Sequence, residues 1–179
     1  MRIGITGHNG FIGYHLYQTL KYKFENYIVL PFQRSFFENP ESLNSYVSSC
    51  DVIIHLAGVN RADSDNEVYD SNMQICTSLN NALLSSKFKG HLIFASSCQE
   101  DIKTPYGKAK KESRLILAQT IEELGGAFSG LVIPNVFGPF CKPNYNSFIA
   151  TFCNKILNKE EPVIIKDEKL HLIYVGNLV

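Results

Sequence analysis

The sequence feature that most constrains the fold is a short glycine-rich segment near the N-terminus, Gly7–Gly13. It follows a compact apolar run, Arg2–Thr6, and leads into Phe11–Lys23, whose apolar residues have helical spacing. In such a strand–turn–helix unit the glycines permit a tight turn, a close pyrophosphate and close packing of helix on strand. The N–H groups that open the helix then face the phosphates. The residues expected to bind a dinucleotide here are Gly7, Asn9, Gly10, Phe11, Ile12 and Gly13.

Strands and helices alternate along the chain, which indicates a parallel sheet with helices on both faces. The predicted strands are Arg2–Thr6, Tyr27–Phe32, Asp51–Leu56, His91–Ala95, one ending in Leu131–Pro134, Glu161–Lys166 and Leu170–Val175. The predicted helices are Phe11–Lys23, Tyr69–Leu84, Pro105–Gly125 and Asn146–Asn158. The expected fold class is α/β, a Rossmann-type doubly wound parallel sheet, forming one NAD(P)-binding domain over residues 1–179.

Composition excludes several classes of partner. The formal net charge is zero and charged residues make up 19% of the chain, so nothing favours nucleic acid as a partner. No apolar run approaches the roughly 20 residues that span a bilayer, and the N-terminus has no signal-peptide pattern. The five cysteines are odd in number and lack metal-ligand spacing. The cysteines predict reduced thiols in a cytoplasmic protein and no metal site. The lack of a long apolar run predicts no membrane partner.

A second group of small residues follows the third predicted strand, at Leu56, Ala57 and Gly58. Ligands of a doubly wound sheet lie beyond the carboxyl ends of its strands. Small residues at that edge let the chain pass close to a flat dinucleotide. We therefore expect these three residues to contact the cofactor.

A tyrosine and a lysine four residues apart, Tyr106 and Lys110, open the helix predicted over Pro105–Gly125. This spacing puts both side chains on one helix face. A free tyrosine has a pKa of about 10, too high for acid–base work at neutral pH. A neighbouring ammonium favours the phenolate and lowers that pKa. Lys110 is also expected to reach the cofactor ribose, and the strand before this helix ends in Ser96 and Ser97, which supply a hydroxyl beside the tyrosine.

The segment after the second predicted strand predicts the choice of cofactor. Tyr27–Phe37 contains no Asp or Glu, the residues that bind the ribose 2′-OH of NAD. Arg34 stands about 20 residues beyond the glycine segment, where a 2′-phosphate needs a cation. NADP is therefore the expected cofactor, with NAD as the alternative.

These motifs, in this order and together with Pro134–Pro139, resemble the extended short-chain dehydrogenase/reductase family, which includes the NAD-dependent epimerases and dehydratases. The resemblance implies a Rossmann sheet, a Ser–Tyr–Lys catalytic set and mostly nucleotide-sugar substrates. The set corresponds here to Ser97, Tyr106 and Lys110, with Ser96 as the alternative serine. The resemblance also implies a cofactor contact from Pro134.

Two further stretches, Ala57–Arg61 and Phe140–Cys153, resemble the CapF family of capsular polysaccharide enzymes. That resemblance implies an NADPH-dependent reductase of a 4-keto UDP-sugar, which in the family is followed by a C-terminal cupin domain. The polar side chains of these stretches are able to hydrogen-bond phosphate and sugar groups. The expected substrate-binding residues are Asn60, Arg61, Asn135, Lys142, Asn144 and Asn146.

Other activities within the family stay open. A 4-epimerase and a 4,6-dehydratase are the alternatives to a reductase, although Glu100 and Asp101 stand too far along the chain for an easy match to the acidic pair of the dehydratases. A dinucleotide-binding module without turnover is a further alternative, against which the intact catalytic set argues. The chain ends at Val179, within the stretch that precedes the family's C-terminal substrate region. We therefore expect a nucleotide-binding part that lacks this region.

A homodimer is also expected. The helices predicted over Tyr69–Leu84 and Pro105–Gly125 correspond to the pair through which the family usually dimerises. The second carries apolar residues at Leu117, Ile121 and Leu124 and again at Leu115 and Ala118. One buried stripe needs fewer, so a second apolar stripe suggests a partner surface.

Overall fold

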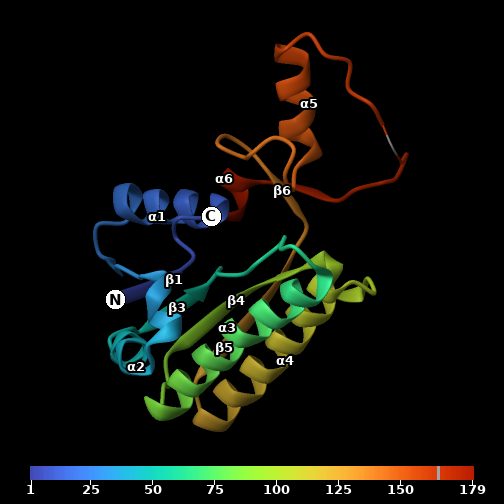
Figure 1. Cartoon of the computed structure of the whole chain (residues 1–179). Helices are drawn as coiled ribbons and strands as arrows, with labels where there is room; N and C mark the ends of the chain where they lie inside the picture. The colour runs from blue at the N-terminus through green and yellow to red at the C-terminus, as the bar shows by residue number, and fades with distance from the viewer. Residues whose placement is uncertain (165) are drawn as a thin grey trace. The chain divides into compact units, whose positions relative to one another are not determined.

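The structure, a computed structural model, describes residues 1–164 and 166–179 (Figure 1). The chain divides into two compact units, Met1–Val132 and Ile133–Val179. No helix among the described residues is long and apolar enough to cross a lipid bilayer.

A five-stranded sheet forms the centre of the first unit, in the order β2-β1-β3-β4-β5. Its strands are β1 (Arg2–Thr6), β2 (Ile28–Leu30), β3 (Val52–His55), β4 (His91–Ser97) and β5 (Ala127–Ile133). The pairs β1–β2, β1–β3 and β3–β4 are parallel. Because β2 and β3 lie on opposite sides of β1, the winding reverses there, as in a doubly wound fold. The predicted α/β fold class is confirmed, although β2 is shorter than expected.

Helices cover both faces of this sheet, and each face has its own core. Leu20 of α1 (Phe11–Lys23) packs with Ile3 and Ile5 of β1. The opposite face is covered by α2 (Pro40–Ser48), α3 (Asp65–Ser85) and α4 (Pro105–Leu124). Helices α3 and α4 lie side by side along the sheet (Figure 1). Their start signals are clear, because Ser64 and Thr104 cap the first turns with their side-chain oxygens.

The sequence interpretation missed one α-helix and two 3₁₀ helices of this unit. One is α2, which begins at Pro40 directly after the N-cap Asn39, whose side chain accepts from the Ser42 N–H at 2.9 Å. Another is the 3₁₀ helix η2 (Cys98–Asp101), which links β4 to the loop before α4. A further 3₁₀ helix, η1 (Arg34–Glu38), follows β2.

The second unit contains a two-stranded parallel sheet of β6 (Asn135–Phe137) and β7 (Leu172–Tyr174), with α5 (Phe148–Leu157) between them and α6 (Val175–Leu178) at the end. The strand predicted over Glu161–Lys166 is wrong for residues 161–164 and 166, which form no strand, and residue 165 lies outside the described residues. Val163 and Ile164 are 64% and 69% exposed, so no neighbouring strand buries them. The strand predicted over Leu170–Val175 is shorter than expected, because Val175 begins α6.

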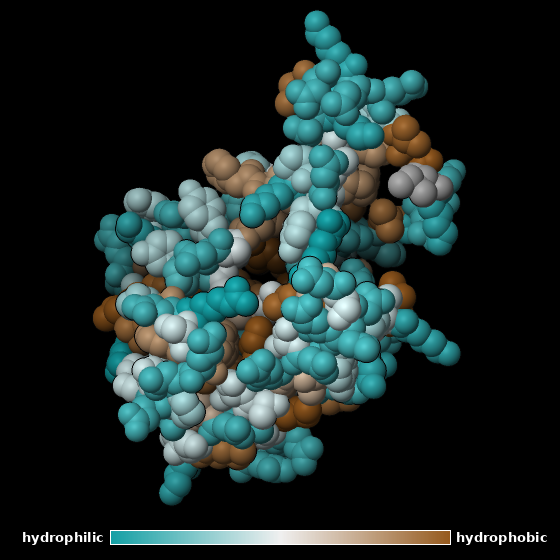
Figure 2. Space-filling view, viewed as in Figure 1, coloured by the Kyte–Doolittle hydropathy of each residue, from teal (hydrophilic) through white to brown (hydrophobic). Residues whose placement is uncertain are grey.

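Figure 2 shows hydrophilic side chains over much of the visible surface, with apolar ones in separate small areas between them.

All five cysteines are free thiols, and Cys50 and Cys76 are buried. Buried thiols behave as small apolar side chains. Cys141 is half-buried, and Cys98 and Cys153 are exposed.

Candidate active site

The glycine segment forms the predicted turn between β1 and α1. Gly7 has a φ of +77°, a conformation that favours glycine, and its carbonyl accepts from the Gly10 N–H at 2.9 Å. A β-carbon at Gly13 would lie 2.2 Å from the same carbonyl oxygen, so α1 can begin this close to the turn only with glycine there. The N-cap Gly10 has no side chain to cap the first turn. The N–H groups of that turn are thus placed as at the phosphate sites of other helices.

A buried polar pair fixes the neighbouring strand ends. Thr6 Oγ1 lies 2.7 Å from His55 Nδ1, and it accepts from the Ala57 N–H at 3.3 Å. Complete burial, with Lys110 as a smaller cause, lowers the pKa of His55 to about 3. The unprotonated nitrogen of a neutral imidazole can accept a hydrogen bond from the Thr6 hydroxyl, and the Thr6 oxygen can then accept a hydrogen bond from the Ala57 N–H. This pair therefore holds the loop after β3 beside the glycine turn.

The loop Leu56–Gly58 is held from its other side by Asn72 of α3, a residue that the sequence interpretation missed. The Val59 N–H donates to Asn72 Oδ1 at 3.1 Å, and Asn72 Nδ2 donates to the Val59 carbonyl at 2.7 Å. The only sequence signal was a polar residue on the apolar stripe of α3. Asn60 and Arg61, predicted to bind substrate, follow this loop and are exposed.

Lys110 is 5% exposed, which is unusual for a lysine outside a functional site. Its Nζ lies 4.6 Å from the centre of the Phe94 ring, and the other partner of that ring is His55, stacked at 5.7 Å. Burial lowers the pKa of Lys110 to about 8, while Cys76 and Glu100 act in the opposite direction. The same Nζ would lie 3.8 Å from a β-carbon at Gly58, so the ammonium reaches the predicted cofactor loop.

Tyr106 is the second residue of α4 and is half-buried. The capping hydroxyl of Thr104 accepts from the Gly107 N–H at 3.1 Å and so fixes the helix start. Lys110 follows one turn later in the same helix, which places it on the face of Tyr106. The predicted Tyr–Lys pair therefore lies at the carboxyl edge of the sheet.

The two serines at the end of β4 have different surroundings. Ser96 is buried, and its hydroxyl donates to the Glu100 carboxylate. Ser97 is half-buried, and its Oγ accepts from the Gln99 N–H at 3.2 Å, so its own hydroxyl proton is not used in that bond. Of the two, Ser97 is the better donor to a ligand.

Arg34 is exposed and begins η1, directly after the chain leaves β2. Leu30 of β2 pairs with Gly4 of β1, so both strands run out at the same edge of the sheet. Arg34 and the glycine turn therefore follow neighbouring strand ends, which is the placement expected of a residue that recognises the cofactor ribose.

The remaining predicted residues belong to the second unit. Pro134 precedes β6, and the Asn135 N–H donates to the His171 carbonyl at 3.2 Å. Lys142, Asn144 and Asn146 are exposed in the loop before α5. The Asn144 N–H donates to Thr151 Oγ1 at 2.9 Å, so α5 orders this loop. The structure thus places Lys110 beside the loop after β3 and packs the turn that carries Tyr106 against η2. In the second unit it shows an ordered polar loop.

Known proteins share this fold and sequence pattern. Residues 3–179 match the model of the NAD dependent epimerase/dehydratase family. UDP-2-acetamido-2,6-beta-L-arabino-hexul-4-ose reductase of Pseudomonas aeruginosa is 33% identical over 181 aligned residues, which cover 100% of this chain and 48% of that protein. The capsular polysaccharide assembling protein CapF of Staphylococcus aureus is 32% identical with a TM-score of 0.77, covering 99% of this chain and 46% of CapF.

The fold is also that of RMD from Pseudomonas aeruginosa, solved in complex with NADPH, with a TM-score of 0.85 at 21% identity, over 99% of this chain and 70% of RMD. The chain spans about half the length of the reductase and of CapF.

Proposed function

Because the chain belongs to the NAD-dependent epimerase/dehydratase family of extended short-chain dehydrogenases/reductases, we propose that it is the nucleotide-binding part of an NADPH-dependent reductase. The substrate is a 4-keto-6-deoxy UDP-N-acetyl-sugar, a precursor of a surface polysaccharide such as capsule. The observation that carries this proposal is the 33% identity, over the whole chain, to a reductase of such a ketone. The buried Lys110 beside the predicted cofactor loop supports this proposal. Burying an ammonium costs free energy, and such buried charges are typical of functional sites.

In this proposal the nicotinamide gives its hydride to the carbonyl carbon at C4, and negative charge develops on the carbonyl oxygen. Tyr106 donates a proton to that oxygen, and Ser97 donates a hydrogen bond to it. Donors already in place stabilise such charge best, because they need no reorganisation during the reaction. The Lys110 ammonium favours the phenolate left on Tyr106 and binds the ribose. The substrate contacts proposed by resemblance are Asn60, Arg61, Asn135, Lys142, Asn144 and Asn146.

The surroundings of Glu100 argue against the dehydratase alternative. Its carboxylate is 5% exposed and is bound by Arg114 and Ser96, so it is not available to move a substrate proton. The neighbouring Asp101 is 89% exposed and pairs with Lys111 at 3.3 Å. The direct test follows NADPH oxidation by the complete gene product with the 4-keto sugar. Stoichiometric NADPH consumption with formation of one alcohol supports the reductase, and interconversion of two alcohols without net consumption identifies an epimerase.

Arg34 supports NADPH over NADH in this proposal. Its exposed guanidinium follows β2, and a guanidinium can bind a 2′-phosphate through two parallel hydrogen bonds, that is, bidentately. Arg34→Ala is expected to weaken NADPH binding about tenfold to a hundredfold, an effect typical of charged hydrogen bonds, and to leave NADH affinity within about twofold. Calorimetric titration of both cofactors into this chain measures the difference. Lys23→Ala, at the exposed end of α1, is the matched control; equal affinity of the wild type for NADPH and NADH contradicts the assignment.

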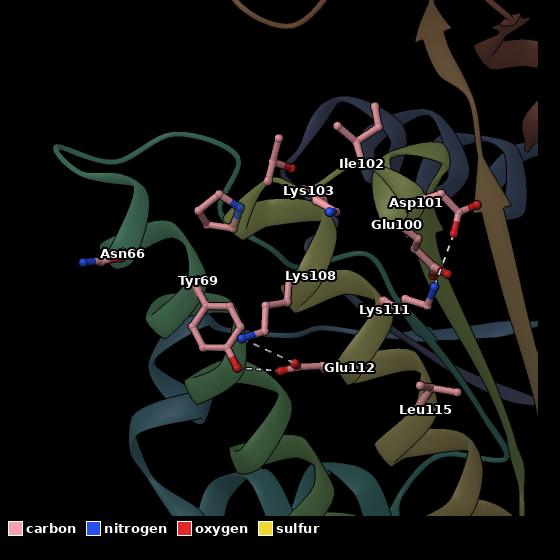
Figure 3. Close-up of a pocket in the computed structure, with 12 residues that line it drawn as sticks. Asn66, Tyr69, Glu100, Asp101, Ile102, Lys103, Lys108, Lys111, Glu112 and Leu115 are labelled. Atoms are coloured by element: carbon pink, nitrogen blue, oxygen red, sulfur yellow. Dashed lines mark hydrogen bonds and ion pairs between the residues drawn. The ribbon is translucent and has the colours of Figure 1, made fainter.

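The exposed face of α3 and α4 supports a homodimer. Of the second apolar stripe, Leu115 is 55% exposed and Ala118 is half-buried. A hollow of about 680 Å³ lies on this face, and Tyr69 reaches across it to donate to Glu112 at 2.5 Å (Figure 3). A helix face with an exposed leucine beside a hollow is the kind of surface that a second copy covers.

Leu115→Glu is therefore expected to convert a dimer into a monomer, because it places a charge in an apolar interface. Light scattering at about micromolar concentration reads the mass directly. Leu157→Glu, on an 83% exposed leucine of α5, serves as the control and is expected to leave the dimer intact. A monomeric wild type refutes the dimer.

A cytoplasmic location completes the proposal, supported by the free thiols.

A further inference from the structure

A buried ion pair lies directly beside the proposed catalytic residues. The Glu100 carboxylate, in η2, is 5% exposed, and Arg114 of α4 is 29% exposed. Arg114 Nε donates to the two carboxylate oxygens at 2.8 and 3.1 Å, and its Nη2 donates at 2.7 Å. The hydroxyl of Ser96, at the end of β4, donates to the same carboxylate. Three elements, β4, η2 and α4, therefore meet at one side chain.

The packing around Arg114 leaves the pair little freedom. A β-carbon at Gly130 of β5 would lie 2.7 Å from Arg114 Cδ, so the arginine stem occupies the space of a missing side chain. The Arg114 hydrogen bonds, and to a smaller extent Ser96, hold the pKa of Glu100 below its usual value. The pair therefore stays ionised and bidentate near neutral pH.

The segment that the pair fixes connects the proposed serine to the proposed tyrosine. At one end of η2, Ser97 Oγ accepts from the Gln99 N–H at 3.2 Å. The carbonyl oxygen of the same Gln99 would lie 2.0 Å from a β-carbon at Gly107, so η2 packs directly on the helix turn that carries Tyr106. A shift of η2 thus moves Ser97 relative to Tyr106.

We propose that Glu100 and Arg114 are positioning residues of the reductase reaction: their ion pair fixes η2 and thereby the separation of the Ser97 hydroxyl and the Tyr106 phenol. This inference rests on the proposed function. Both groups must reach one carbonyl oxygen at once, and a displacement of about 1 Å can cost a hundredfold in rate. The pair also binds the Ser96 hydroxyl, which leaves Ser97 as the serine that faces the ligand.

The chain contains a matched control for this proposal. Lys111 and Asp101 join the same two elements, α4 and η2, at 3.3 Å (Figure 3), but their side chains are 49% and 89% exposed. Exposed pairs contribute little to stability or position. Asp101→Asn is therefore expected to leave kcat, KM and the oligomeric state in solution unchanged.

The test compares Glu100→Gln and Asp101→Asn with the wild type in the complete gene product. For Glu100→Gln we expect kcat for the 4-keto sugar to fall about tenfold to a hundredfold, with the Kd for NADPH within about twofold. Amide exchange in residues 98–107 is expected to become faster in Glu100→Gln and to stay unchanged in Asp101→Asn.

The double variant Glu100→Leu/Arg114→Met separates positioning from stability. Replacing a buried ion pair by apolar residues often restores stability, so its thermal midpoint is expected near that of the wild type while kcat stays low. Recovery of kcat together with the midpoint, or a wild-type kcat in Glu100→Gln, overturns the proposal. If the wild type does not reduce the ketone, the proposed function itself fails. The amide exchange then decides alone, and unchanged exchange in Glu100→Gln overturns the positioning role.

Discussion

Tyr106→Phe is expected to lower kcat by about a hundredfold to ten-thousandfold, the range in which general acid catalysis contributes. The phenyl ring keeps the shape of the side chain at the start of α4 but cannot donate a proton to the carbonyl oxygen. In the proposed site the glycine turn and the loop after β3 bind the cofactor, so the Kd for NADPH is expected to stay within about twofold. NADPH oxidation with the 4-keto sugar, measured at saturation in the complete gene product, gives the change in kcat.

A matched tyrosine is available on α1. Tyr22 is 71% exposed and lies far along the helix from the glycine turn, so Tyr22→Phe is expected to turn over like the wild type. A Tyr106→Phe protein with near wild-type kcat removes Tyr106 from the mechanism. A loss confined to KM, with kcat intact, reassigns Tyr106 to substrate binding, because uniform binding does not change the chemical step.

Local chemistry explains why the cofactor turn could be predicted from the sequence. Gly7–Gly13 stands between two elements with clear periodicity, and each glycine has a local reason for its position. The helix that carries Tyr106 and Lys110 could be predicted for the same reason, and its geometry fixes their four-residue spacing.

The residues that the sequence did not reveal act through tertiary contacts. Asn72 binds the loop after β3 from the middle of α3, and Glu100 is bound by Arg114 fourteen residues later. Neither spacing has a local signature. Glu100 was weighed only as part of an acidic pair, whereas the structure shows its carboxylate already bound.

The error at Glu161–Lys166 has a related cause. A compact apolar run is typical of a strand, but a strand also needs a partner for its backbone groups. β7 pairs instead with β6, through Leu172–Tyr174. Periodicity therefore located β1–β5 and β7, which pair, but could not by itself exclude the apolar run at residues 161–164, which forms no strand.

The buried ammonium of Lys110 is expected to make stability depend on pH in a defined direction. Its pKa is lowered from 10.5 to about 8 in the folded protein, with burial as the main cause. Between these values the unfolded chain binds a proton that the folded chain does not. The free energy of unfolding therefore rises with pH across this window, by up to about 3 kcal/mol. Below about pH 8 both states are protonated, and the full cost of burying the charge is present.

Lys110→Met removes this titration. Three neighbouring groups in the core act in the opposite sense, because burial raises the pKa values of Tyr46, Cys50 and Cys76, and their contribution falls as pH rises. These groups are present in both proteins, so the informative quantity is the difference in unfolding free energy between variant and wild type. The variant is expected to be the more stable near pH 7, and its advantage is expected to shrink by about 3 kcal/mol toward pH 10.5.

Urea unfolding of both proteins at a series of pH values measures this difference. Cys76 contributes directly to the pKa of Lys110, so the comparison is repeated in a Cys76→Ala background, where the same trend is expected. An advantage that does not change with pH means that the ammonium is not desolvated in the folded state. A shrinking advantage shows that the fold keeps a charged lysine at this point at a cost in stability. A purely structural role in the core does not require that charge, whereas binding a ribose and activating Tyr106 both require it.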